Sequence, residues 1–103
     1  MERPCTVTRW RVQPDQRADL LETLSKLEAV LLGLPRPPCS LLVLQSTDDP
    51  SIVHTIGWFE SQADLESMRQ HDEARRLLEE LVRLSSEFRP TAHVVVRAAG
   101  GQR

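Results

Sequence analysis

One stretch decides the fold of this chain: Trp58–Leu65, which reads WFESQADL. An aromatic pair closes the preceding run, Ile52–Phe59, whose β-branched composition predicts a strand. Ser61 follows at once as a helix N-cap, and Asp64 completes a pattern close to a capping box, with Asp in place of the usual Glu or Gln. A strand that passes directly into a capped helix is therefore predicted here, and we expect that helix to break near His71.

The rest of the chain alternates between strand-like and helix-like segments. Residues of one strand alternate between the two faces of a sheet, whereas leucines spaced as in Leu20, Leu24 and Leu27 share one helix face. The predicted elements are a strand over 6–12, a helix over 15–32 capped by Asp15, strands over 39–47 and 52–59, a split helix from 61 to before Pro90 whose second segment is capped by Asp72, and a strand over 91–98.

This order, strand-helix-strand-strand-helix-strand, predicts an α+β fold of the ferredoxin-like βαββαβ type. Right-handed crossovers place the four strands in one antiparallel sheet with both helices on one face. The 103 residues make a single domain, with a core over about 5–98 and a tail over 99–103.

The second face of this sheet has nothing left in the chain to cover it. The run Leu41–Leu44 is apolar at consecutive positions, which indicates a strand covered on both faces. We therefore expect a homodimer whose sheets face each other, with Arg9, Arg11 and Thr55 as polar contacts in or around the interface.

Composition excludes several classes of partner and of chemistry. The net charge of −2 predicts no nucleic-acid footprint, and no apolar run approaches the roughly 18 residues of a membrane span. Cys5 and Cys39 are predicted to open strands separated by a third strand, about 9–10 Å apart, too far for a disulfide. Two free thiols, no signal peptide and no membrane segment lead us to expect a cytoplasmic protein.

The stretch Trp58–Leu65, the later His71–Ala74 and the Pro38-Cys39 start of the second strand resemble the antibiotic biosynthesis monooxygenase family. The resemblance covers about residues 5–98. It implies a dimeric α/β barrel and a cavity between sheet and helices inside each subunit. It also implies oxidation of a small phenolic, quinol or polyketide-like substrate without metal, flavin or other cofactor.

On this resemblance the cavity is expected to hold apolar walls, two indoles and one or two imidazoles. His54 or His71 would be the base that removes a substrate proton, and Trp58 would donate a hydrogen bond to the developing oxyanion. The expected substrate-binding residues are Trp10, Ile56, Leu65 and Met68.

The chain also departs from the family pattern, because it contains no Asn and no Tyr. Haem-degrading and polyketide-modifying members use those residues, so their mechanisms do not transfer directly. Two alternatives therefore stand beside the monooxygenase: a non-catalytic dimeric ligand-binding or accessory module, and an isomerase or cyclase on the same scaffold. The three histidines are too dispersed in sequence to predict a metal site.

Overall fold

The computed structural model describes residues 3–99 of the chain. The predicted order of elements is confirmed, and residues 100–103 of the predicted tail lie outside the described residues. In chain order the elements are β1 (Arg3–Arg11), a short 3-10 helix η1 (Pro14–Gln16), α1 (Arg17–Leu32), β2 (Ser40–Gln45), β3 (Ile52–Trp58), α2 (Gln62–Arg69), α3 (Asp72–Leu84) and β4 (Glu87–Val95).

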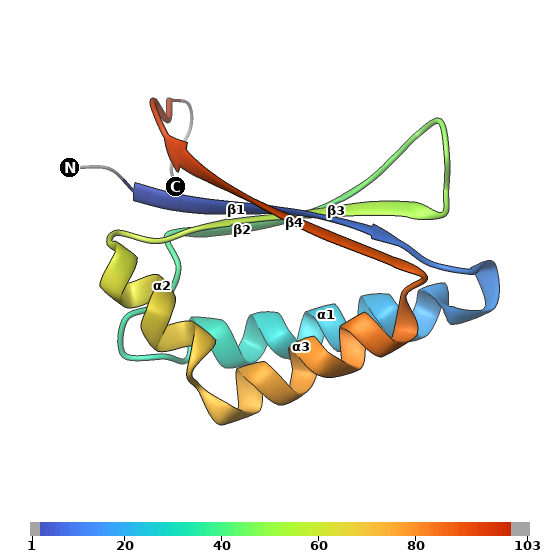
Figure 1. Ribbon diagram of the computed structural model, residues 1–103, viewed down its shortest axis with the longest axis horizontal. Helices are drawn as coiled ribbons and strands as arrows, with labels where there is room; N and C mark the ends of the chain where they lie inside the picture. The colour runs from blue at the N-terminus through green and yellow to red at the C-terminus, as the bar shows by residue number, and fades with distance from the viewer. Residues whose placement is uncertain (1–2, 100–103) are drawn as a thin grey trace.

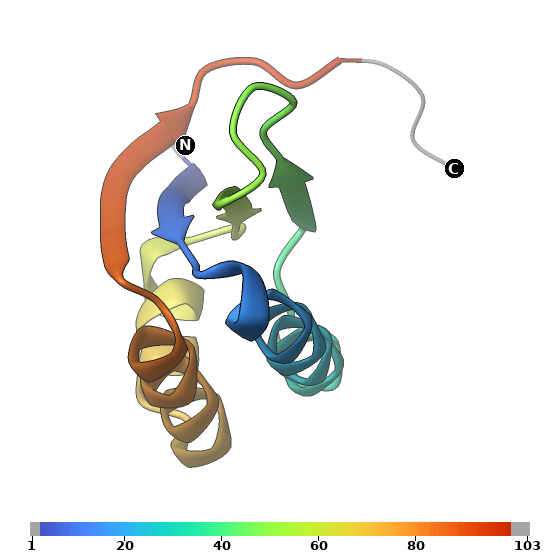
Figure 2. The ribbon, with the colours of Figure 1, turned by 90° about the vertical axis from the view of Figure 1, so that its right-hand side faces the viewer.

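The four strands form one antiparallel sheet in the order β2-β3-β1-β4. All helices lie on one face of this sheet, with α1 and α3 side by side beneath it (Figures 1 and 2). The ferredoxin-like α+β fold predicted from the sequence is therefore confirmed. Because β3 separates β1 from β2, Cys5 and Cys39 stay apart, and both are free.

The core lies between the sheet and the α1–α3 pair. Trp10 and Val53 from the sheet meet Leu20 and Leu24 of α1 and Leu81 of α3, and each is at most 5% exposed. The helical spacing of the leucines explains this placement, and each fully buried side chain contributes about 1.5–3 kcal/mol. The buried side chain of Trp10 therefore identifies which face of the sheet the helices cover.

Two helix starts differ from the sequence prediction. Asp15 was expected to cap the first helix, but it lies in η1, and α1 begins two residues later with no side-chain cap. Pro14 favours the first turn of a helix, and the chain here forms a tight 3-10 turn before the α-helix starts. At the second break His71, rather than the expected Asp72, is the N-cap of α3.

The last strand also begins earlier than predicted. β4 starts at Glu87 and contains Pro90, which was expected to lie before the strand. Because β4 is an edge strand, a residue without an N–H group is tolerated in it.

The face of the sheet opposite the helices, called the open face below, remains uncovered in the single chain. Leu42 and Leu44 of β2 are 51% and 44% exposed on it. Of the helices that the structure describes, none is both long and apolar enough to pass through a bilayer.

Candidate functional site

A cavity of about 280 Å³ lies between the helix face of the sheet and the helices. Its floor comes from β1 and β3, one side from β2 and α1, and the other from α2, α3 and β4. Its lining includes Thr6, Thr8, Trp10, Glu28, Thr55, Gly57, Phe59, Leu65, Met68 and Arg69.

The floor of the cavity carries its uncharged polar groups. Thr8 of β1 stands directly opposite Thr55 of β3, and Thr6 stands opposite Gly57. Trp10 donates its indole N–H to Thr55 Oγ1 over 3.1 Å. Three hydroxyls therefore gather where the two central strands meet, in otherwise apolar surroundings.

The walls of the cavity are apolar and partly aromatic. Trp10 is 2% exposed, and its ring centroid lies 4.9 Å from that of Phe88 of β4, with the planes tilted by 42°. Leu65 and Met68 of α2 and Phe59, directly after β3, complete the surface near the α2 end. Such a lining suits a flat hydrophobic molecule.

Two charged residues, Glu28 of α1 and Arg69 of α2, line the cavity from different helices. Arg69 is exposed and its Nη1 lies 3.0 Å from Glu66 Oε2. Glu28 is half-buried, and among residues 3–99 its carboxylate makes no ion pair within 4 Å. It is thus the carboxylate best placed to meet a molecule in the cavity.

A second, more open hollow of about 440 Å³ adjoins the first between β4 and α2. Both hollows are lined by Thr6, Leu65 and Arg69. Arg69, on the exposed side of α2, therefore borders both hollows.

The residues expected to bind substrate lie around the cavity. Trp10, Leu65 and Met68 line it with Ile56. Ile56 stands opposite Val7, outside the Trp10 row, so its side chain belongs to the open face, and its expected place among the side chains on the Trp10 face is wrong. A role for these residues in binding stays a prediction.

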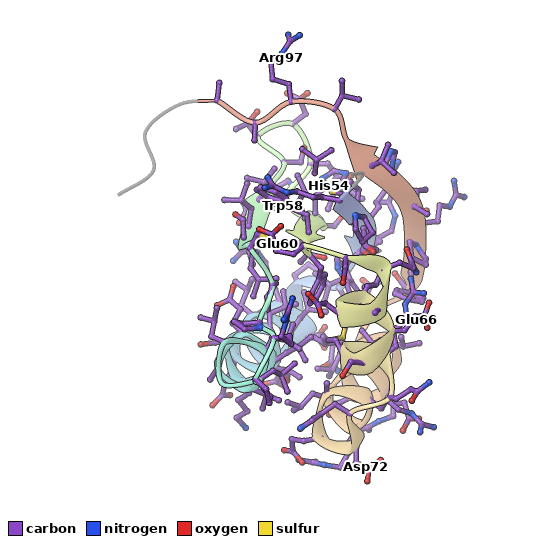
Figure 3. All side chains as sticks on the ribbon, turned by 90° about the vertical axis from the view of Figure 1, so that its left-hand side faces the viewer. His54, Trp58, Glu60, Glu66, Asp72 and Arg97 are labelled. Atoms are coloured by element: carbon purple, nitrogen blue, oxygen red, sulfur yellow. The ribbon has the colours of Figure 1, made fainter. Side chains whose placement is uncertain are left out.

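His54 and Trp58 were expected to share the cavity with Trp10, and this placement is wrong. Trp10 stands opposite Val53, whereas His54 stands opposite Arg9 and Trp58 opposite Cys5. Side chains alternate between faces, so both lie on the open face, away from the helices (Figure 3).

On the open face Trp58 is held by its neighbours at the end of the sheet. The Arg3 guanidinium lies 5.3 Å from its ring centroid, and Arg3 also pairs with Glu60 at 3.3 Å. These contacts indicate a packed surface aromatic residue rather than a wall of the cavity.

His71 was the other expected base, and it too lies outside the cavity lining. Its Nδ1 accepts a hydrogen bond from the Ala74 backbone N–H at 3.3 Å, which caps α3. One ring nitrogen is thereby committed to the helix N-terminus. His93, the third histidine, lies 2.8 Å from Thr91 through its Nε2, on an exposed part of β4.

Sequence reasoning missed Phe59 and Glu28, and it placed Thr55 at the dimer interface, which is wrong because Thr55 shares the helix-facing row of Val53. The signal for Thr55 and Phe59 was present, because Val53, Thr55, Gly57 and Phe59 alternate together and the two ends of this run, Val53 and Phe59, are buried. Glu28 carried no such signal, since in the sequence it flanks the leucine stripe of α1 just as the exposed charged residues of that helix do.

The surroundings of both cysteines favour the thiol over the reactive thiolate. Burial raises the pKa of the Cys5 thiol. Burial also raises the pKa of Cys39, and a hydrogen bond from its Sγ to Glu60 Oε2 at 3.4 Å adds to the effect. Within residues 3–99, no three His, Cys, Asp or Glu side chains converge as metal ligands.

No family model and no curated protein matches the sequence. Solved structures do match the fold. A proposed antibiotic biosynthesis monooxygenase of Nitrosomonas europaea superposes with a TM-score of 0.83 at 14% identity, over 95% of this chain and 94% of that one. A conserved protein of Methanosarcina mazei gives 0.82 at 15% identity, over 90% and 92%.

A third match, from Bacteroides thetaiotaomicron, is described as a conserved protein of unknown function and possible oxidoreductase. It superposes with a TM-score of 0.83 at 12% identity, over 91% of this chain and 98% of that one. At these identities the matches show a shared fold over nearly the whole chain. The resemblance drawn from the sequence is thus confirmed at the level of fold.

Proposed function

We propose that this protein binds a small hydrophobic aromatic, quinol or polyketide-like molecule in the cavity on the helix face and oxidises it as a cofactor-independent monooxygenase. The observation that carries the proposal is the cavity itself, about 280 Å³ in volume and lined by Trp10, Phe59 and Met68 with three threonine hydroxyls on its floor. The names of several fold relatives supply the reaction class.

In this reaction the substrate itself supplies the electrons. In an aromatic ketone such as anthrone, loss of a proton from the activated CH2 group gives an anion that reduces O2. The CH2 carbon becomes a carbonyl, one oxygen atom of O2 enters the product, and the other leaves as water with the two hydrogens. The protein need only bind the ring, accept the proton and exclude bulk water.

Glu28 takes the role of proton acceptor in this proposal. The histidines predicted for that role lie outside the cavity lining, whereas Glu28 lines it from α1. A carboxylate beside an apolar cavity is a competent general base.

The second candidate is a non-catalytic ligand-binding module, and one observation favours it. Among residues 3–99, none of the three histidines lines the cavity, so the base most often used near neutral pH is missing from the site. Both candidates share the ligand class and the cavity.

The experiment uses the two tryptophans, which lie on opposite faces of the sheet. In Trp58→Phe the remaining tryptophan is Trp10, which lines the cavity. In Trp10→Phe the remaining tryptophan is Trp58, which lies on the open face. Each variant is titrated with 1-tetralone while tryptophan fluorescence is recorded, and oxygen uptake of the wild type is then measured with anthrone.

We expect saturable quenching in Trp58→Phe and none in Trp10→Phe. We also expect the wild type to consume oxygen faster than the protein-free control. Quenching without uptake would favour the binding module. If only Trp58 responds, or neither tryptophan does, the cavity is not the ligand site and the proposal is overturned.

We also propose that two copies of the chain pair through the open face. Three apolar residues stand side by side on it: Ile56 of β3 lies between Val7 of β1 and Leu42 of β2. Arg9 supports the same conclusion: its Nε is buried and has no hydrogen-bond partner among residues 3–99. An unmatched buried donor costs about 1–3 kcal/mol, and an acceptor from a second copy would remove that cost.

A further inference from the structure

The hydrogen bond between Trp10 and Thr55 fixes what the Thr55 hydroxyl can offer. A hydroxyl has one proton to donate and two lone pairs to accept with, whereas an indole N–H can only donate. Thr55 Oγ1 accepts from Trp10 Nε1 over 3.1 Å. One lone pair is used, and the Thr55 proton is directed elsewhere.

That proton meets no acceptor of the protein in the part of the chain that the structure describes. Thr55 takes part in one side-chain hydrogen bond there, the one in which it accepts. Thr55 lines the cavity, so its O–H group is free to donate to a molecule bound there. Trp10, 2% exposed and packed on Phe88, cannot easily turn away and release Thr55 from this arrangement.

Thr8 supplies a second hydroxyl at the same place. It stands directly opposite Thr55 in the β1–β3 ladder, and the Cβ atoms of such pairs lie about 4.5–5.5 Å apart. Thr8 is 7% exposed and lines the cavity, and its oxygen is not sealed off by the protein. Two hydroxyls can therefore reach one atom of a bound molecule.

The surroundings make this pair selective. Trp10, Leu24 and Phe59 surround the floor with apolar side chains, and a hydrogen bond made there is stronger once a bound ligand excludes water. A ligand that displaces water from these hydroxyls without offering them a hydrogen-bond partner binds less tightly, because buried polar groups left unpaired cost free energy. The floor thus discriminates between a ligand with an acceptor oxygen and a hydrocarbon of equal shape.

We infer that Thr55, oriented by Trp10 and assisted by Thr8, is the binding point for one carbonyl or phenolate oxygen of a flat aromatic ligand. The inference rests on the proposed function, because it needs the cavity to be the ligand site. It narrows the ligand class to aromatic ketones, quinones and phenols. During deprotonation of a ketone, the same donors face the oxygen on which negative charge develops.

The test compares 1-tetralone with tetralin, which share a two-ring shape and differ by the ketone oxygen. Affinities are measured by calorimetry for the wild type and for Thr55→Val, which removes the hydroxyl but keeps the shape. Thr55→Ser retains the hydroxyl, and Thr91→Val removes a hydroxyl that bonds to Val7 O on β1 outside the cavity lining.

The wild type and Thr91→Val are expected to prefer the ketone. Thr55→Val should lose about tenfold in affinity for 1-tetralone, as for one hydrogen bond, while its affinity for tetralin is unchanged. Thr55→Ser should keep most of the preference. If Thr55→Val does not fold, Thr55→Ala replaces it in the same comparison.

An unchanged ratio of the two affinities in Thr55→Val would overturn the inference and leave the cavity proposal standing. If neither compound binds the wild type, the proposed function itself fails. The two failures are therefore distinguishable.

Discussion

Trp10 and Val53 stand directly opposite each other in the β1–β3 ladder, and both are buried against the helices. This pairing decides which side chains of β3 reach the cavity. Every second residue from Val53 follows it, so Thr55 and Gly57 face the helices. The residues between them, His54 among them, face away.

Gly57 leaves room in the floor of the cavity, and a side chain there should obstruct it. An added Cβ would lie 3.0 Å from Leu41 Cδ2, so Leu41 must shift slightly. We expect Gly57→Ala to weaken binding of 1-tetralone about fivefold while changing stability by about 1 kcal/mol or less. Gly33→Ala, where the added Cβ meets only ordinary contacts at 3.5 and 3.6 Å, is the matched control. Equal affinities for both variants would place the ligand elsewhere.

Glu28 should be required for turnover but not for binding. Glu28→Gln keeps the size of the side chain and removes its ability to accept a proton as a carboxylate. We expect the rate of oxygen uptake with anthrone to fall about 100-fold, within the range for a general base, with ligand affinity little changed. Glu22→Gln, on an exposed position of the same helix, should leave the rate unaltered. A Glu28→Gln protein with normal uptake would exclude Glu28 as the base.

The open face should hold the dimer together. Leu42 is 51% exposed on this face, and a charge there would be buried between two sheets. Leu42→Glu is expected to be monomeric in sedimentation velocity at concentrations where the wild type is dimeric. Leu32→Glu changes an even more exposed leucine, at 62%, on α1 and should remain a dimer. A monomeric wild type would contradict the proposed interface.

The start of α2 depends on a single hydroxyl. Ser61 Oγ accepts from the Asp64 backbone N–H at 3.1 Å, as the sequence predicted. Ser61→Ala should therefore lower the free energy of unfolding by about 0.5–2 kcal/mol in urea titrations. Ser67→Ala, on the exposed side of the same helix, should have little effect. A similar loss in both variants would mean that the cap contributes nothing specific.

The ion pairs of Arg11 with two carboxylates should make the free energy of unfolding depend on pH under acidic conditions. Its Nη1 lies 3.2 Å from Asp49 Oδ2, and its Nε lies 3.2 Å from Glu87 Oε1. Hydrogen bonds from Ser51, with Arg11 adding to them, lower the pKa of Asp49, and the hydrogen bond from Arg11 lowers the pKa of Glu87.

A carboxylate with a lowered pKa stabilises the fold above its unfolded pKa, about 4, and loses that effect as pH falls through the folded value. The wild type should therefore lose stability below about pH 4. In Arg11→Met the loss should be shallower, and the two curves should converge in strong acid. If the free energies of unfolding of both proteins, measured in urea titrations, changed in parallel from pH 7 to pH 2.5, the two ion pairs would contribute nothing to stability.

The order of elements and the helix-side core could be predicted from the sequence because each rests on local periodicity. The facing of β3 could not. Alternation shows that His54 and Trp58 share a face, but the pairing with β1 decides which face that is, and a shift of one residue reverses it. The apolar Val53 and Phe59 at the ends of the other row were the available signal.

Two further differences from the prediction concern Pro90 and His71. Pro90 is acceptable within β4 only because that strand lies at the edge of the sheet, which no local pattern reveals. Asp is a stronger capping residue type than His, so Asp72 was expected to cap α3. Instead the imidazole of His71 accepts from the Ala74 N–H, and the helix starts at Asp72, one residue earlier than predicted. In consequence a histidine that was expected in the cavity caps a helix outside its lining.

The most direct measurement is a crystal structure of the protein grown with 1-tetralone. We expect the ligand between the sheet and the helices, with its ring against Trp10 and its oxygen within hydrogen-bond distance of Thr55 Oγ1. A ligand on the open face beside Trp58, or a cavity closed by Leu65 and Met68 with no ligand inside, would contradict this expectation.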